Sequence, residues 1–207
     1  MIKPTLRKLS SWKRQISQRN EFLGALIHII IIMIVALVAI TGFTYFILQP
    51  YQVEGGSMNP TLQSGDRILV LRLGRITSDI LGSDHIPKRG EMIVFSSHLD
   101  DRKLIKRVIG LPGEEVEIRN KKIIIYNDDF PQGFEPQFNL DPPLLELSSM
   151  EPYLKRSIGQ GELFVVGDNR LPKQSNDSRG EIGNIPLNQI DGTVVWRLWP
   201  LTEMGLF

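Results

Sequence analysis

The stretch "EVEIRNKKIIIY", Glu115 to Tyr126, sets the fold class of the second part of this chain. It contains two apolar runs joined near Asn120-Lys121, a pattern typical of a β-hairpin. Similar runs of strand length surround it, rich in β-branched residues and separated by Gly, Pro, Asn and Asp. They read "RILVLRL", "EMIVFSS", "KLIKRVIG", "GELFVVGD" and "GTVVWRLW". We expect no amphipathic helix longer than two turns among them, so the pattern predicts a mainly β domain of antiparallel sheets.

The segment 127–161 interrupts this pattern. It contains Pro131, Pro136, Pro142, Pro143 and Pro152 and shows little periodicity. We therefore expect a variable insertion here, forming a long excursion or a small subdomain on the β scaffold.

The apolar run from Phe22 to Leu48 precedes the β pattern and contains no Asp, Glu, Lys or Arg. It exceeds the about 20 residues that a helix needs to cross a bilayer, and it is too long for the core of a cleaved signal peptide. We expect a retained transmembrane helix over 22–48. Segment 1–21 is basic, which predicts a cytoplasmic N-terminus and an extracytoplasmic domain over 49–207. Its charged residues are Lys3, Arg7, Lys8, Lys13, Arg14 and Arg19, against the single acid Glu21.

The bulk composition excludes several kinds of site. The 207 residues carry a net charge of +1, which gives no general attraction to nucleic acid. The chain has no cysteine, so it has no disulfide and no thiol nucleophile. Its three histidines are scattered and show no metal-ligand spacing. We expect neither a metal nor a cofactor.

A Gly-Gly-Ser turn follows the apolar run, in "GGSMNP", Gly55 to Pro60. Glycines allow backbone angles that expose a serine hydroxyl, and they leave the serine N–H free to bind an oxyanion. Ser57 is therefore a candidate nucleophile. Taken alone, the stretch is better explained as an ordinary turn.

A nucleophilic serine needs a base. His85 and His98 are possible, but neither has a recognisable setting. In "KLIKRVIGLPGE", a strand would put Lys106 on one face with the apolar Leu104 and Val108. Burial lowers the pKa of a lysine, and a neutral lysine can take the serine proton. Alone, this stretch is again better explained as an edge strand with a surface lysine.

A polar loop follows the strand "ELFVV", in "GDNRLPKQSNDSRGEIG", Gly167 to Gly183. Its side chains can hydrogen-bond to the backbone and fix the loop. Asp177 and Arg179 are expected to form an ion pair, and Ser175 is placed to orient a lysine. This loop has too many specific polar groups for a solvated turn to be the better explanation.

Taken together, the three stretches and the apolar run ahead of them resemble type I signal peptidases, which are serine–lysine endopeptidases. The resemblance implies that Ser57 is the nucleophile and Lys106 the general base. It also implies that Ser175, Asp177 and Arg179 support the site, while Gly55, Gly56 and Met58 contact the substrate. Asp168, Asn169 and Arg170 match the start of the family's last motif and are expected to be structural. The loop from Arg170 to Ser175 is two residues longer than the usual pattern.

The resemblance further implies the removal of signal peptides from exported preproteins, without a cofactor. The substrate would bind as an extended strand between Tyr51–Gly56 and Arg102–Lys106. Preproteins and membrane lipids are the expected partners, and the plasma membrane is the expected location. A thylakoid or an organelle's inner membrane is the alternative. Two alternative functions stay open, namely a maturation peptidase for one pilin or conjugation substrate, and an inactive membrane-anchored binding module.

Overall fold

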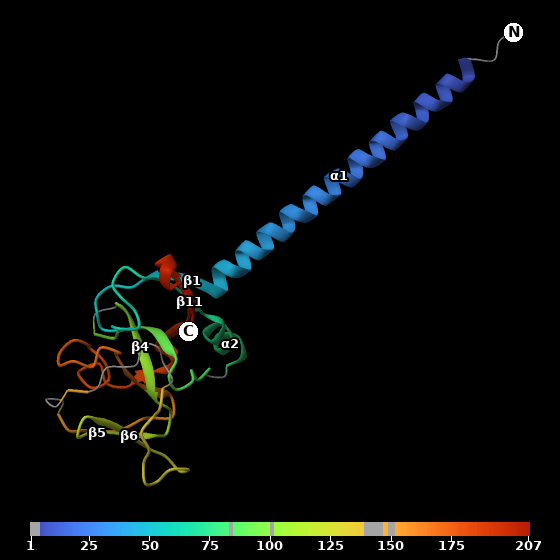
Figure 1. Cartoon of the computed structure of the whole chain (residues 1–207). Coiled ribbons are helices and arrows are strands. Elements are labelled where there is room, and N and C mark those ends of the chain that lie inside the picture. Colours follow the sequence, from blue (N-terminus) through green and yellow to red (C-terminus); the bar gives the residue numbers. More distant parts are fainter. Residues whose placement is uncertain (1–4, 83–84, 100–101, 139–146, 149–151) are drawn as a thin grey trace. The chain divides into compact units, whose positions relative to one another are not determined.

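The computed structural model describes residues 5–82, 85–99, 102–138, 147–148 and 152–207. The chain divides into two compact units, 1–46 and 47–207. Helix α1, Thr5–Ile47, makes up nearly all of the first (Figure 1). Its segment Phe22–Ile47 is long and apolar enough to cross a membrane, and its side chains are largely exposed. Such a segment leaves its apolar side chains to lipid, because a single helix satisfies its own backbone hydrogen bonds.

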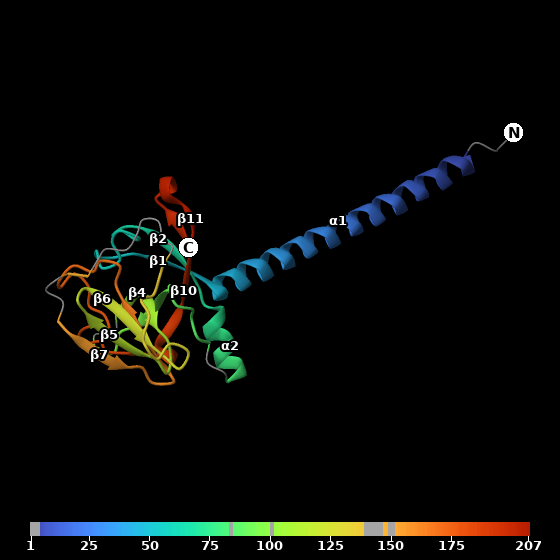
Figure 2. The ribbon, with the colours of Figure 1, turned by 60° about the horizontal axis from the view of Figure 1, so that its bottom comes forward.

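The second unit is built on one large antiparallel sheet with the strand order β1-β2-β10-β3-β4-β8-β9, in which β11 also pairs with β10 (Figure 2). Every strand pair in the described residues is antiparallel, so the predicted fold class is confirmed. The strands are β1 Leu48–Gln52, β2 Arg67–Leu71, β3 Met92–Ser96, β4 Lys103–Gly110, β8 Glu162–Val166, β9 Ile185–Pro186, β10 Ile190–Trp199 and β11 Gly205–Leu206.

A smaller sheet has the order β6-β5-β7 and contains the predicted hairpin. Strands β5 (Glu115–Arg119) and β6 (Lys122–Tyr126) pair in register. Asn120 and Lys121 between them both have positive φ, at 49° and 66°. Two positive φ values are characteristic of a two-residue type I′ turn, whose twist matches that of the flanking strands.

The segment predicted as an insertion contributes to this smaller sheet. Strand β7, Leu154–Ser157, pairs with β5, and Phe134 forms an isolated bridge with Ile125. Leu147 is buried in the same apolar cluster as Ile118 and Ile125. Residues 139–146 and 149–151 of the insertion lie outside the described part of the chain.

One expectation about the second unit is wrong. Helix α2, Leu73–Leu81, follows β2 directly and has more than two turns. Its apolar residues recur at Leu73, Ile76 and Ile80, which is helical spacing. The run is short and includes Gly74, so its helical period is easily missed beside the strand-like pattern around it. Two short 3-10 helices, Leu187–Gln189 and Leu201–Glu203, flank β10.

Candidate active site

The Gly-Gly-Ser turn connects β1 to β2 and is anchored by its apolar residues. Met58 and Leu62 are at most 2% exposed and pack in one core cluster with residues of β2 and β3. The Leu62 N–H donates to the Met58 carbonyl at 2.9 Å. Gly55 has a φ of +82°, a conformation that side-chain-bearing residues rarely adopt. This turn holds Ser57 half-buried.

Lys106 comes from the middle of β4 and is 2% exposed. Its Nζ lies 2.8 Å from Ser57 Oγ and 2.8 Å from the Ile105 carbonyl. Burial lowers the pKa of Lys106 to about 8, although the negative charges of Asp177 and Asp168 oppose the shift. The structure therefore brings together a serine hydroxyl and an amine. Because the pKa of this amine is close to physiological pH, losing its proton costs little free energy.

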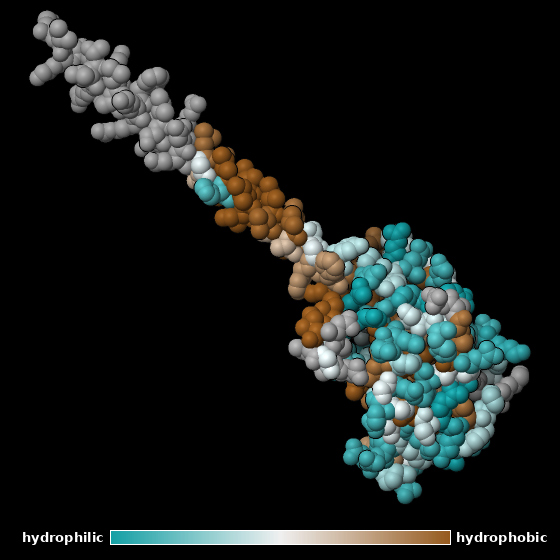
Figure 3. Space-filling model, turned by 180° about the vertical axis from the view of Figure 1, so that it is seen from behind, coloured by the Kyte–Doolittle hydropathy of each residue, from teal (hydrophilic) through white to brown (hydrophobic). Residues whose placement is uncertain are grey.

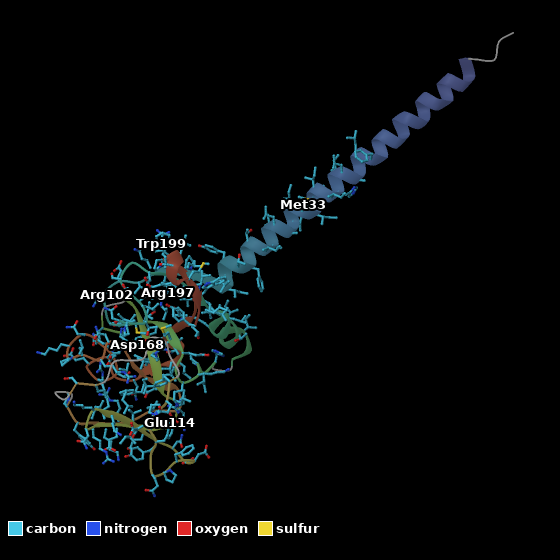
Figure 4. The ribbon with its side chains drawn as sticks, viewed as in Figure 1. Met33, Arg102, Glu114, Asp168, Arg197 and Trp199 are labelled. Carbon is cyan, nitrogen blue, oxygen red and sulfur yellow. The ribbon has the colours of Figure 1, made fainter. Side chains whose placement is uncertain are left out.

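The next residue of β4 fixes the start of the polar loop. Arg107 makes a bidentate ion pair with Asp168, with Nε at 2.8 Å from Oδ1 and Nη2 at 2.5 Å from Oδ2. Both side chains are at most 3% exposed. Figure 4 shows Asp168 beside β4. A buried pair of this geometry satisfies both charges and holds the loop against the strand that carries Lys106.

The end of the polar loop is fixed by the predicted pair of Asp177 and Arg179. The carboxylate of Asp177 accepts hydrogen bonds from Arg179 Nε at 2.9 Å and from the Gly167 N–H at 2.9 Å. Burial acts to raise the pKa of Asp177, but the hydrogen bonds and charge of Arg179 outweigh it and lower that pKa. Asp177 is therefore a carboxylate, and its negative charge acts to raise the pKa of Lys106.

Ser175 is packed into the same region, although its predicted bond to Lys106 is not formed here. A Cβ placed on Gly167 would lie 2.2 Å from Ser175 Oγ and 2.5 Å from the Ser57 carbonyl, so the three residues are in close contact. The Ser175 hydroxyl contributes to lowering the pKa of Asp177. In the described residues, Lys106 Nζ bonds to Ser57 and Ile105 and not to Ser175. The role of Ser175 toward Lys106 stays a prediction.

Asn169 has a position that the sequence did not indicate. Its side-chain Nδ2 donates to the Gly56 carbonyl at 3.0 Å, and its backbone N–H donates to the Ser57 carbonyl at 3.0 Å. Asn169 is 7% exposed. It therefore clamps the peptide unit on each side of the Ser57 Cα. In the sequence, only its place in the polar loop from Gly167 to Gly183 drew attention to Asn169. That place predicts a structural role but not a contact with Gly56.

A cleft of about 270 Å³ runs beside Ser57. The two segments expected to flank the substrate both line it, and so do Ser57 and Lys106. Gly55 and Met58 line it as well, whereas Gly56 is not among the lining residues. The two histidines considered as bases do not line this cleft. His85 packs against Gly74 in α2, and His98 is exposed in the loop between β3 and β4.

Comparisons with known proteins match most of the chain. The family described as "Signal peptidase, peptidase S26" matches residues 26–199, which include Ser57, Lys106 and Asp177. The signal peptidase I of Bacillus amyloliquefaciens is 31% identical over 172 residues, covering 83% of this chain and 84% of that relative. Signal peptidase IB of Staphylococcus aureus is 33% identical over 191 residues, covering 86% and 92%. A solved signal peptidase I from Enterococcus faecalis is 27% identical, with a TM-score of 0.41, and covers 54% of this chain and 98% of its own.

Proposed function

Because this chain belongs to the signal peptidase family, peptidase S26, we propose that Ser57 and Lys106 are its nucleophile and its general base. The enzyme is a membrane-anchored peptidase that removes signal peptides. The observation that carries the proposal is the 2.8 Å contact between Lys106 Nζ and Ser57 Oγ, together with the lowered pKa of Lys106. A serine with a neutral amine at this distance can attack a carbonyl without a histidine.

The first half of the reaction forms an acyl-enzyme. Neutral Lys106 accepts the hydroxyl proton as Ser57 Oγ bonds to the scissile carbonyl carbon, and the carbonyl oxygen becomes an oxyanion. The C–N bond then breaks, the amine of the mature protein leaves with the proton from Lys106, and the signal peptide stays esterified to Ser57. In the second half, neutral Lys106 takes a proton from water as the water oxygen attacks the ester carbonyl. Ser57 recovers its proton when the acyl-enzyme C–O bond breaks.

The Ser57 N–H is the proposed donor to the oxyanion. Asn169 holds the Gly56 carbonyl, and the N–H of Ser57 belongs to the same peptide unit. In a trans peptide the C=O and N–H point in opposite directions, so this contact turns the Ser57 N–H away from Asn169. Ser57 lines the cleft and Asn169 does not, which supports an N–H aimed at the bound carbonyl.

The substrate is proposed to be an extended peptide in the Ser57 cleft. Edge strand β1 leads into Tyr51–Gly56 on one side, and Arg102–Lys106 belongs to or precedes β4 on the other. An extended peptide can place alternate side chains in pockets between two such segments. Small residues at the first and third positions before the cut suit a cleft of this size. Preproteins that carry signal peptides are the proposed substrates.

The proposed orientation puts residues 1–21 in the cytoplasm and the catalytic domain outside it, in the plasma membrane. The basic N-terminal segment supports this orientation. Leu48 and Ser57 are nine residues apart, so Ser57 lies at most about 32 Å from the end of the apolar helix. The tether therefore keeps Ser57 near the membrane surface where a signal peptide ends, which raises the effective concentration of substrate. Protease protection in spheroplasts tests this orientation, since a domain outside the cytoplasm is digested before lysis.

The decisive experiment is cleavage of a preprotein with Ala-X-Ala before the cut, in detergent. We expect wild type to cleave at this site and Ser57→Ala and Lys106→Met to lose at least about 10³-fold in kcat/KM. Lys122→Met is the matched control, because this exposed lysine lies on the smaller sheet, and it should cleave as wild type. Activity that survives in Ser57→Ala would contradict the nucleophile assignment.

The two alternative functions are not favoured, because the relatives are named signal peptidase I. A maturation peptidase would cleave one preprotein and leave a panel of others uncut. An inactive binding module would not react with a serine-directed acylating probe, whereas the proposed enzyme is labelled at Ser57.

A further inference from the structure

Part of the polar loop has no role in the mechanism given above. From Arg170 to Asn176 it reads "RLPKQSN", with two cations and no acid, and we call this the basic segment. The Gln174 N–H donates to the Leu171 carbonyl at 3.3 Å, which closes a β-turn. Lys173, at the third position of this turn, is exposed and has a φ of +59°, a conformation in which glycine is usual. A lysine in this strained position indicates a constraint other than the turn itself.

Both ends of the basic segment are held beside Ser57. At its start, Asn169 donates hydrogen bonds to the carbonyls on each side of the Ser57 Cα. Near its end, Ser175 lies against Gly167, and a Cβ on that glycine would lie 2.5 Å from the Ser57 carbonyl. Two residues of chain span at most about 7 Å, so the Cα of Lys173 lies within that distance of the Cα of Ser175. The flexible side chain of Lys173 therefore reaches the surroundings of Ser57.

The acids beside the basic segment are already paired. The carboxylate of Asp168 is bound by Arg107, and its side chain is 1% exposed. The carboxylate of Asp177 is bound by Arg179, and its side chain is also 1% exposed. Arg170 has no such partner. In the part of the chain that the structure describes, its guanidinium forms no ion pair, and its Nε is buried without a hydrogen-bond partner. The basic segment thus keeps a positive charge that an incoming carboxylate can neutralise.

The path of the substrate leads from the Ser57 cleft to the basic segment. The cleft is lined by residues of 51–58 and 102–106 and, among the described residues, by none of 167–178. The signal peptide fills this cleft as far as the cut, so the mature part leaves it at Ser57, where the polar loop is the neighbour.

The mature part of the substrate meets a surface on which charge can select. On the face seen in Figure 3, the second unit is mostly hydrophilic. An extended chain advances about 3.3 Å per residue, so the second to fourth residues after the cut lie about 7–13 Å from it. Charges at such distances still interact in dilute salt, because the Debye length is then above about 10 Å.

We propose that Arg170 and Lys173 select substrates that carry Asp or Glu at the second to fourth positions after the cut. The inference rests on the proposed function and adds a selectivity for the part of the preprotein that leaves. The substrate carboxylate pairs with the basic segment while the scissile bond is placed at Ser57, and it departs with the mature protein. Lysine at the same positions is repelled, so selection acts in both directions.

Three preproteins that differ only at these positions test the proposal. All have Ala-X-Ala before the cut, and residues two to four after it are Asp, Asn or Lys. We expect wild type to cleave the Asp form with a kcat/KM at least about fivefold above the Lys form at about 20 mM salt, and to lose most of this ratio at about 500 mM. Lys173→Gln should lower the ratio at least about twofold, and Lys173→Glu should bring it to one or below.

Lys122→Gln is the matched control, because this exposed lysine lies on the smaller sheet, and it should keep the wild-type ratio. Arg170→Gln should also lower the ratio. Arg170 is half-buried, whereas Lys173 is on an exposed turn, so the Lys173 variants decide the outcome even if Arg170→Gln does not fold. A wild-type ratio of one, or a ratio that Lys173→Glu leaves unchanged, would overturn the proposal.

Binding separates this selectivity from the proposed function. Fluorescence anisotropy of labelled, uncleaved peptides on Ser57→Ala gives a Kd for each form without turnover, and we expect the Asp form to bind most tightly and the Lys form least. Equal Kd values for the three forms would contradict the selectivity. Failure of wild type to cleave even the Asn form would instead contradict the proposed function, and the order of the Kd values would still report the selectivity.

Discussion

The middle of β4 in the large sheet and the start of β6 in the small sheet carry their charged residues in opposite ways. On β4 of the large sheet, Lys106 and Arg107 are at most 3% exposed. On the small sheet, Lys122 pairs with Glu135 at 2.5 Å while both side chains are about half exposed. Exposed charges stay solvated and gain little from pairing, whereas a buried charge must be paired or lose its charge. The difference shows that burial, more than ion pairing, lowers the pKa of Lys106 on β4.

Two adjacent residues of β4 show both outcomes of burial. Arg107 is bound by the carboxylate of Asp168 and stays charged. Lys106 points to the other face of the strand, where a serine hydroxyl and a backbone carbonyl accept its hydrogen bonds. With no carboxylate bound to its amine in the described residues, burial lowers its pKa. One strand thus supplies a fixed ion pair that holds the loop and an amine that can act as a base.

Removing the buried pair's cation gives the largest expected effect on stability. Arg107→Met leaves the Asp168 carboxylate buried and unpaired, which typically costs about 3–5 kcal/mol. Urea unfolding of the full chain in micelles, followed by tryptophan fluorescence, measures the change. The double variant Arg107→Met/Asp168→Asn removes the orphaned charge and should regain part of the loss. A cost below about 1 kcal/mol for the single variant would end the contrast between the buried pair on β4 and the exposed pair on β6.

Asn169→Ala should lower kcat about 10- to 100-fold with little change in KM. The variant removes the hydrogen bond that orients the Gly56–Ser57 peptide, and a misplaced N–H stabilises the oxyanion less. Steady-state kinetics on the Ala-X-Ala preprotein separate the two constants.

Asn184→Ala is the matched control for this variant. Asn184 Nδ2 also donates to a backbone carbonyl, that of Ser157 at the end of β7, and to the Glu162 carboxylate. Its loss should change stability by about 1 kcal/mol and leave kcat unchanged. Equal losses of kcat in both variants would mean that Asn169 acts through general stability, and would remove its positioning role.

The pH dependence of cleavage reports the burial of Lys106 directly. Only the neutral amine can accept the Ser57 proton, so kcat/KM should rise about tenfold per pH unit at low pH and level off above about pH 8. Asp177 raises the pKa of Lys106 by its negative charge, so Asp177→Asn should move the midpoint to lower pH. A midpoint near 10.5, the ordinary pKa of lysine, would show that the Lys106 amine is solvated. Lys106 on β4 would then be no different from the exposed Lys122 on β6.

Much of the fold was readable from local patterns. The hairpin at Asn120-Lys121 and strand β4 were predicted because turn residues separate short runs that are rich in β-branched residues. Strand β1 was missed because its first residue, Leu48, is the last of the apolar run, and the rest of the strand is short and contains Pro50. An edge strand tolerates a proline, and β1 is at the edge of the sheet. Helix α2 was missed because it is only nine residues long and includes Gly74, so its helical period is weak beside the strand-like runs around it.

The site was readable only in part. Family resemblance pointed to Ser57 and Lys106, and the structure places them 2.8 Å apart although they are separated by 49 residues. The pair of Arg107 with Asp168 and the clamp of Asn169 on Gly56 join positions 61 and 113 residues apart. No local period encodes such distances, because they depend on how the sheet brings β4 and two loops together.

The exposed pair on the small sheet gives the smallest expected effect. Lys122→Met should change the free energy of unfolding by less than about 0.5 kcal/mol, because both partners are solvated before and after the change. The same urea titration measures it, and raising the salt concentration should reduce even this difference. A loss of 2 kcal/mol or more would place Lys122 among residues whose charge is needed for folding. The distinction between the buried charges of β4 and the exposed pair at the start of β6 would then fail.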